Sequence, residues 1–254
     1  MILDSFRLDG QVALVTGASR GLGQGAALAL AEAGADLALL DRGDASETIA
    51  QAEALGRRVH AMRCDFATAT PDDLSAAVAE AINAMGAVDI LVNNAGTIRR
   101  SAAVDYPVQD WDEVLAVNLD AVFHLSQAAG RHMISRGRGR IINVASMLTF
   151  QGGIRVPAYA ASKHAVAGLT KALANEWAAS GVTVNAIAPG YMATDNTTAL
   201  RDDPERERSI VARIPAGRWG TPGDLQGAFV FLASPAAAYV TGAILPVDGG
   251  WLVR

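Results

Sequence analysis

The sequence predicts a single α/β domain over residues 1–254, with a doubly wound parallel sheet of about seven strands and helices on both faces. The chain length suits one large α/β domain. Short apolar runs of strand length alternate with longer helical patterns, and no shift in composition marks a second domain. Strict alternation of strands and helices favours right-handed crossovers, and therefore a parallel sheet that is buried on both faces.

The individual elements follow from periodicity. In the segment 71–85, Leu74, Val78, Ile82 and Met85 recur at spacings of four, four and three, which places them on one helical face. The expected strands are 12–16, 36–41, 59–62, 88–93, 141–146 and 183–188, and a further helix is expected over 21–33.

Composition and charge exclude several functional classes. The formal net charge is -5 and no basic block occurs, which argues against a nucleic acid or an anionic membrane as the main partner. The single cysteine, Cys64, permits no internal disulfide, and the four histidines lack ligand-like spacing, so we expect no metal. Residues 1–10 lack the apolar region of a secretory signal, and no membrane span is apparent. We therefore expect a cytoplasmic protein.

A glycine-rich segment joins the first expected strand to the first expected helix. Residues 16–23 read TGASRGLG. Gly17, Gly21 and Gly23 permit a tight turn and a close approach of the backbone to a pyrophosphate. The helix that follows offers unpaired N–H groups and the positive end of its dipole. The glycines alone would indicate only a turn, but their position between strand and helix predicts a dinucleotide site.

The end of the second expected strand indicates which nucleotide binds. Asp41 stands there, and its carboxylate can accept both ribose hydroxyls of NAD and would repel the 2′-phosphate of NADP. Arg42 and Arg20 are the alternative, because either guanidinium can pair with that phosphate. We expect NAD, with Asp65 and Phe66 after the third strand close to the adenine.

A tyrosine and a lysine form the expected catalytic pair. Tyr159 and Lys163 are four residues apart and share one face of a helix. A phenol has an unperturbed pKa of about 10, and a nearby ammonium favours the phenolate, which suits a proton donor or acceptor. Ser146 is expected at the end of the fifth strand, where its hydroxyl can bond the substrate oxygen. A surface Tyr and Lys are the usual meaning of this spacing, but the glycine turn and the serine favour an active site.

Six motifs in order carry a resemblance over the whole length of the chain. They are T-G-x-x-x-G-x-G at 16–23, N-N-A-G at 93–96, a helical asparagine at Asn118, Ser146, Y-x-x-x-K at 159–163 and P-G-x-x-x-T at 189–194. In these motifs the chain resembles the short-chain dehydrogenase/reductase family. The resemblance implies a Rossmann-type domain that moves a hydride between nicotinamide C4 and a carbonyl/alcohol pair without a metal.

The resemblance also implies residue roles. Tyr159 exchanges a proton with the substrate oxygen, Ser146 holds that oxygen, Lys163 bonds the nicotinamide ribose, and Asn118 holds a water that links Lys163 to solvent. The cofactor residues expected from the motifs and strand ends are Gly17, Ser19, Arg20, Gly21, Leu22, Gly23, Asp41, Asp65, Phe66, Asn93, Ala95, Gly96, Tyr159, Lys163, Pro189, Gly190, Met192 and Thr194.

The resemblance implies a homotetramer, with the apolar end 240–253 close to a neighbouring subunit. The polar segment 191–220 lies beyond the sixth strand. We interpret it as a lid over the substrate, with a solvated loop as the alternative.

Shorter signatures narrow the substrate. Segments 93–100, 145–157, 188–194, 213–220 and 247–251 are similar to those of family members that act on keto and hydroxy sugar acids. The carboxylate of a small acidic sugar needs a cation, and arginine is the natural bidentate partner. Arg155, Arg99 and Arg100 are the candidates, and Gln151 can bond sugar hydroxyls. Each of these arginines can instead be exposed or fix a loop through an ion pair.

Two alternatives stay open. Another reductase of the same family, acting on gluconate or on 3-oxoacyl carrier-protein thioesters, would share every motif. A catalytically inactive member that senses NAD belongs to a different class, and the intact set of Asn118, Ser146, Tyr159 and Lys163 argues against it.

Overall fold

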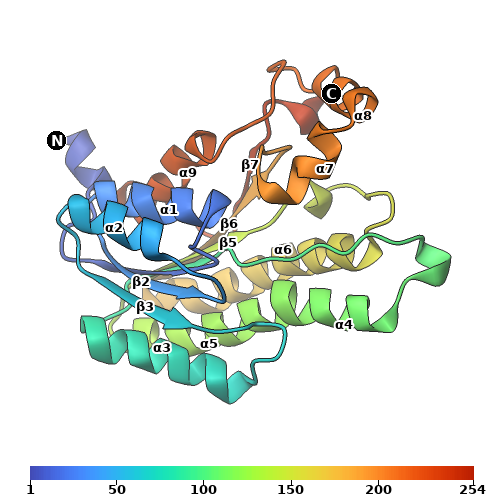
Figure 1. Ribbon diagram of the computed structural model, residues 1–254. Helices are drawn as coiled ribbons and strands as arrows, with labels where there is room; N and C mark the ends of the chain where they lie inside the picture. Colours follow the sequence, from blue (N-terminus) through green and yellow to red (C-terminus); the bar gives the residue numbers. More distant parts are fainter.

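The computed structural model describes all residues, 1–254, and confirms the predicted α/β class. Seven parallel strands form one sheet in the order β3-β2-β1-β4-β5-β6-β7 (Figure 1). The strands are β1 (Val12–Thr16), β2 (Asp36–Asp41), β3 (Val59–Arg63), β4 (Ile90–Asn93), β5 (Gly139–Val144), β6 (Val182–Pro189) and β7 (Ile244–Val247). The helices are α1 (Gly21–Glu32), α2 (Ser46–Ala54), α3 (Pro71–Met85), α4 (Val108–Leu115), α5 (Ala121–Ser135), α6 (Pro157–Trp177), α7 (Thr198–Arg201), α8 (Pro204–Val211) and α9 (Gly223–Ala233).

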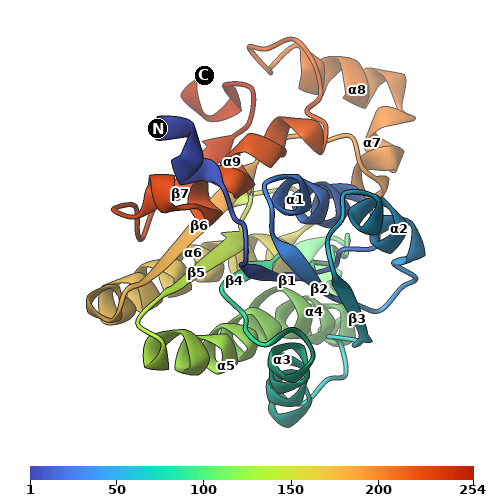
Figure 2. The same cartoon turned by 90° about the vertical axis from the view of Figure 1, so that its left-hand side faces the viewer.

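Helices cover both faces of the sheet. Figures 1 and 2 show α1, α2 and α9 on one face and α3, α4, α5 and α6 on the other. The strand order reverses between β1 and β4, and in such sheets this is where a crevice opens beyond the carboxyl ends of the strands. The crevice therefore lies among the segments that follow β1, β4, β5 and β6. No helix of the structure is both long enough and apolar enough to cross a membrane.

Two hydrophobic cores hold the helices on the sheet. One includes Leu30 of α1 and Phe229 of α9, and the other includes Leu74 of α3 and Leu125 of α5. All five residues of β1 are buried, as expected for a strand between two helical layers. Both faces of the sheet therefore contribute to the stability of the fold, and polar groups in the strands need internal partners.

Most predicted boundaries agree with the structure. Strands β1 and β2 and helix α3 begin and end where the sequence predicted. The fifth strand was predicted over 141–146 but spans Gly139–Val144, so Ser146 lies two residues beyond its end and begins the 3₁₀ turn Met147–Thr149. The fourth strand was predicted from residue 88, but it begins two residues later, at Ile90. Hydrogen bonding to neighbouring strands decides these ends, and a single strand does not carry that information.

A chain of buried amides and hydroxyls crosses the middle of the fold. The Asn93 side chain donates to the Asn143 side-chain oxygen at 2.9 Å and to the Ser126 hydroxyl at 3.0 Å. Asn143 in turn donates to the Thr170 hydroxyl at 2.9 Å. The four residues come from β4, β5, α5 and α6, and none is more than 3% exposed. This network fixes two central strands against two helices, because the side-chain NH₂ groups of both asparagines find buried acceptors on neighbouring elements.

We expect the replacement Asn143→Ala to lower the free energy of unfolding by about 1–3 kcal/mol, because it leaves buried polar partners unsatisfied. Urea unfolding followed by circular dichroism measures the change. The control is Asn83→Ala on the exposed side of α3, where we expect a change within about 0.5 kcal/mol. Equal small effects of both substitutions would contradict a stabilising role for the network.

Candidate active site

The turn between β1 and α1 is built so that only glycine fits. Gly17 and Gly21 have φ angles of 65° and 59°, in the left-handed region that favours glycine. A Cβ on Gly23 would collide with the Gly17 carbonyl oxygen. The turn therefore brings the first N–H groups of α1 to the crevice, where they can receive an anionic group.

A second segment holds this turn in place. The Thr16 hydroxyl accepts hydrogen bonds from the backbone N–H groups of Asn94 and Ala95, at 2.9 and 3.0 Å. The Asn94 side chain donates to the carbonyl oxygens of Thr16 and Gly17, at 2.9 and 3.0 Å. Asn94 and Thr16 were absent from the predicted site residues. Their place inside the two motifs was the signal that could have identified them.

The Asp41 carboxylate lies at the edge of the same turn. It accepts the backbone N–H groups of Ser19 and Gly43, both at 2.8 Å. Asp41 therefore stabilises the turn, and it also places a negative charge at the end of β2. It is only partly buried, so its charge can also act on a ligand.

The two arginines considered as phosphate partners already have acidic neighbours. Arg20 pairs with Asp195 at 2.8 Å, and Arg42 lies 3.8 Å from Asp65. Both pairs are largely exposed to solvent, where such contacts are weak. The charge of each arginine is nevertheless partly compensated within the chain.

The described residues fit a nicotinamide dinucleotide. A Cβ built on Gly96 would lie 3.5 Å from the Asn118 side-chain oxygen and 3.9 Å from the Lys163 ammonium, so this glycine leaves room beside Lys163. On the opposite side of the crevice, Thr194 faces the glycine turn, 3.8 Å from a Cβ built on Gly21. The side chains of Phe66 and Met192, two predicted cofactor residues, are 7% and 5% exposed and pack into the hydrophobic cores.

The structure brings the predicted catalytic residues together. Ser146 accepts the Leu148 N–H at 3.1 Å through its side chain, so its own O–H hydrogen can be donated either to Tyr159 or to a ligand oxygen. Tyr159 and Lys163 lie in the first half of α6, with the ammonium 5.6 Å from the centre of the phenol ring. Lys163 is 4% exposed and donates to the Val144 carbonyl oxygen at 2.7 Å.

Burial dominates the protonation of this pair. It lowers the pKa of Lys163 to about 8. Burial also raises the pKa of Tyr159, while hydrogen bonding to Ser146 and the charge of Arg100 lower it. The expectation that Lys163 draws Tyr159 toward ionisation therefore differs from the structure, because the ammonium is directed to the Val144 carbonyl. The phenol keeps its proton at neutral pH and can donate it to a ligand oxygen.

Asn118 lies in a π-helical turn, Ala116–Asp120, between α4 and α5. Such turns occur frequently at functional sites. The Asn118 side chain accepts the Thr97 N–H at 2.8 Å and donates to the Thr97 carbonyl at 2.9 Å and the Ser162 hydroxyl at 3.2 Å. It thus joins the segment after β4 to α6, close to Lys163.

The predicted substrate arginines have different surroundings. Arg99 pairs with Glu113 at 2.6 Å and lies 3.8 Å from Asp110, which is the loop-fixing ion pair that the sequence left open. Arg100 donates to the Asn196 carbonyl at 3.2 Å. Arg155 is exposed, makes no ion pair and is the only non-glycine residue with a positive φ, 64°. Strained backbone of this kind gathers at functional sites.

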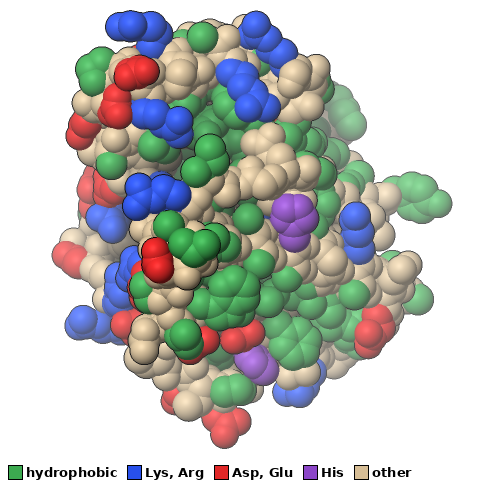
Figure 3. Space-filling model, turned by 90° about the vertical axis from the view of Figure 1, so that its right-hand side faces the viewer, with side chains coloured by type: hydrophobic (Ala, Val, Ile, Leu, Met, Phe, Trp, Pro, Cys, Tyr) green, Lys and Arg blue, Asp and Glu red, His purple; other side chains and the backbone are tan.

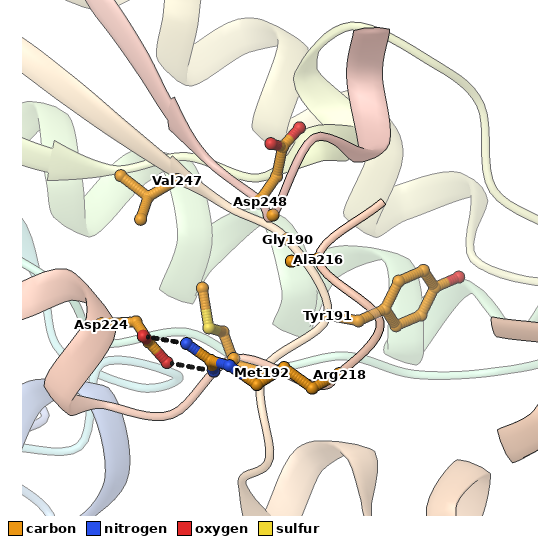
Figure 4. Close-up of a pocket in the computed structure, with 10 residues that line it drawn as sticks. Gly190, Tyr191, Met192, Ala216, Arg218, Asp224, Val247 and Asp248 are labelled. Carbon is orange, nitrogen blue, oxygen red and sulfur yellow. Dashed lines mark hydrogen bonds and ion pairs between the residues drawn. The ribbon is translucent and has the colours of Figure 1, made fainter. Parts of the chain in front are cut away.

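The segment 191–220 contains α7 and α8 and closes on itself through a bridge between Met192 and Gly220. A cavity of about 160 Å³ lies at its base, next to the end of β6. Figure 4 shows Arg218 and Asp224 paired at one side of this cavity and Tyr191 directed away from it. The Arg20–Asp195 pair and the Arg100–Asn196 bond connect the segment to the two sides of the crevice.

Comparisons with known proteins agree with this geometry. A family model described as enoyl-(acyl carrier protein) reductase matches residues 17–252. The chain is 54% identical to 2-dehydro-3-deoxy-D-gluconate 5-dehydrogenase of Escherichia coli K12 over 255 residues, covering 100% of both chains. It is 55% identical to the Bacillus subtilis 168 enzyme of the same name over 252 residues, covering 99% of this chain and 98% of the other.

A solved structure from Agrobacterium tumefaciens, assigned as a 2-deoxy-D-gluconate 3-dehydrogenase with bound NADP, superposes with a TM-score of 0.92. It is 54% identical, with 98% of this chain and 99% of the other covered. The family model and the full-length identities agree on one family. The chain therefore belongs to the short-chain dehydrogenase/reductase family, whose members are oxidoreductases that use a nicotinamide cofactor.

Proposed function

We propose that this protein is an NAD-dependent dehydrogenase of a small acidic sugar, which interconverts 2-dehydro-3-deoxy-D-gluconate and 3-deoxy-D-glycero-2,5-hexodiulosonate. The observation that carries the proposal is the assembly of Ser146, Tyr159 and Lys163 beside the glycine turn. The names of the relatives support the sugar acid. We place the reaction in the breakdown of pectin-derived uronates.

The residues of the site then act on one oxygen of the substrate. A nicotinamide, when bound, supplies the hydride to the carbonyl carbon or accepts it from the alcohol carbon. Ser146 donates a hydrogen bond to the substrate oxygen and holds it beside the Tyr159 hydroxyl. Tyr159 gives its proton to that oxygen in reduction and takes it back in oxidation. Lys163 would bond the nicotinamide ribose, and Asn118 would hold a water that links Lys163 to solvent.

For the cofactor, we propose NAD. The carboxylate of Asp41 supports it, because a 2′-phosphate at the end of β2 would meet that negative charge. The acidic neighbours of Arg20 and Arg42 reduce the attraction of both arginines for a phosphate. The Agrobacterium structure contains NADP, so the preference of this chain has to be measured directly.

We further propose that Arg100, Gln151 and Arg155 contact the substrate, and that segment 191–220 is its lid.

We also propose that the protein is a cytoplasmic homotetramer. Exposed apolar side chains along α4 and α5 support the assembly, among them Val108 (66% exposed) and Trp111 (39%). Light scattering tests the assembly. We expect four times the chain mass of 26.3 kDa, and a mass of one chain would contradict it.

The substrate proposal is tested with a panel of acceptors. We expect NADH oxidation with 3-deoxy-D-glycero-2,5-hexodiulosonate to exceed that with 5-keto-D-gluconate and with 3-oxoacyl thioesters.

We also expect Tyr159→Phe to lower kcat by about 10²–10⁴-fold, because it removes the proton donor. Binding of NADH, followed by fluorescence, should change little.

Tyr239→Phe is the matched control, because Tyr239 is fully exposed. A preference for 3-oxoacyl thioesters would identify another reductase of the family. No turnover of any acceptor together with tight NADH binding would favour a non-catalytic NAD sensor.

We expect Asp41→Asn to raise the kcat/KM ratio of NADPH over NADH by about tenfold or more, because it removes a charge that repels the 2′-phosphate. Initial rates with both cofactors, at one ionic strength, measure this ratio. Asp44→Asn is the control, since the Asp44 carboxylate in the same loop accepts hydrogen bonds only from Ser46. A wild-type protein that already prefers NADPH would refute the NAD proposal.

A further inference from the structure

Several arginines on and beside the lid have no acidic partner, and three of them are Arg206, Arg213 and Arg100. Arg206 is on α8, Arg213 follows that helix, and Arg100 follows β4. No carboxylate lies within 4.0 Å of any of them, whereas Arg99 and Arg218 are both paired. Figure 3 shows several Lys and Arg side chains in the upper half of the molecule, the end that carries α7 and α8. Segment 191–220 contains five acidic and five basic side chains, so these arginines are distinguished by the absence of a direct ion pair and not by a net positive charge.

An aromatic cluster holds one of these arginines in position. The Arg213 guanidinium lies over the Trp251 ring, 4.0 Å from its centre, an arrangement that is favourable for a cation. The Trp251 ring packs edge-on against Tyr191 with their centres 4.7 Å apart, and Tyr191 packs against Trp219 at 5.4 Å. The lid, the end of β6 and the C-terminal turn thus meet at Tyr191.

This cluster adjoins the catalytic residues. Met147, directly after Ser146, packs in one buried group with Trp251 and Ile214. The Trp251 indole N–H donates to the Gln151 side-chain oxygen at 3.3 Å, so the Gln151 NH₂ group keeps its two hydrogens for a ligand.

The electrostatics at Tyr191 agree with this placement. Burial raises the pKa of Tyr191, while Arg206, Arg213 and Arg100 lower it, and no acidic group opposes them. Arg100 also lowers the pKa of Tyr159, and its guanidinium donates to the Asn196 carbonyl of the lid at 3.2 Å. The Tyr191 hydroxyl accepts and donates no hydrogen bond within the chain, and Figure 4 shows it directed away from the cavity at the base of the lid.

We propose that Arg213, held over the Trp251 ring, binds the carboxylate of the sugar acid together with Arg206 and Arg100, and that Trp251 positions Arg213 and Gln151. The proposal deepens the function proposed above and rests on it. Arginine forks bind carboxylates through paired N–H groups, and the guanidinium of Arg213 has no carboxylate partner within the chain. Trp251 connects Arg213 to Met147, which directly follows Ser146, so a sugar acid held at Arg213 can extend toward Ser146 and Tyr159.

The test is the oxidation of 2-dehydro-3-deoxy-D-gluconate at saturating NAD. We expect Arg213→Met to raise the KM of the sugar acid by about tenfold or more, as for a lost hydrogen bond to a charged group. The KM of NAD and the kcat should stay within about twofold. Arg213→Lys should recover part of the loss, because it keeps the charge but not the fork.

Arg208→Met is the matched control, because Arg208 is an exposed arginine on α8 that has no ion-pair partner and does not act on Tyr191. Arg155→Met separates this site from the arginine predicted from sequence. Arg206→Met provides a second test if Arg213→Met does not fold, as judged by circular dichroism. Quenching of tryptophan fluorescence by D-gluconate should weaken in Arg213→Met and stay unchanged in Arg208→Met.

The possible outcomes are distinguishable. A wild-type protein that turns over no sugar acid overturns the proposed function. A wild-type protein that does so, with an unchanged KM in both Arg213→Met and Arg206→Met, overturns only the carboxylate site. An equal rise in KM for Arg208→Met, or a rise confined to Arg155→Met, also overturns it. A rise in KM for the replacements of Arg206 and Arg213, with Arg208→Met unchanged, supports the site whether or not Arg155→Met also raises the KM.

Discussion

The hydrogen bonds between Thr16 and the segment after β4 connect the two strands at which the sheet reverses its order. Thr16 accepts two backbone N–H groups from that segment, and Asn94 returns two bonds to the glycine turn. The crevice of a doubly wound sheet opens at this point, so its two walls are held together by these bonds. These hydrogen bonds therefore position the glycine turn relative to Gly96 and to the space beside Lys163.

Burial sets the chemistry on the other side of the crevice. Burial lowers the pKa of Lys163, which is 4% exposed, and raises the pKa of Tyr159. Burial therefore favours the neutral form of both side chains. The Ser146 hydroxyl and Arg100 reduce the cost of the phenolate, so the charges around Tyr159 come from several elements rather than from its helical neighbour alone.

Segment 191–220 and the C-terminal turn lie beside this site. Residues 191–220 are connected to the glycine turn through Asp195 and to the segment after β4 through Asn196. Trp251 packs against Tyr191 and bonds Gln151, although it comes from the last four residues of the chain. Cofactor, catalytic and substrate walls are therefore coupled through a few polar contacts on a rigid sheet.

The local sequence pattern predicted several elements of this structure and several residues of the site. Periodicity placed β1, β2 and α3, and the motifs located Ser146, Tyr159 and Lys163, because side-chain period and turn chemistry are properties of neighbouring residues. The last strand, β7, was included only in the expected strand number, since the apolar run around it carries no clear period.

The sequence by itself determined the fold class, the glycine turn and the catalytic pair, because each depends on residues that are close in the chain. Only the tertiary structure decided that Arg99 is paired with Glu113, that Lys163 is directed to the Val144 carbonyl, and that Arg213 stacks on Trp251. Those contacts join residues from different elements, and a side chain's partner and burial are fixed only when the packed elements bring such residues together.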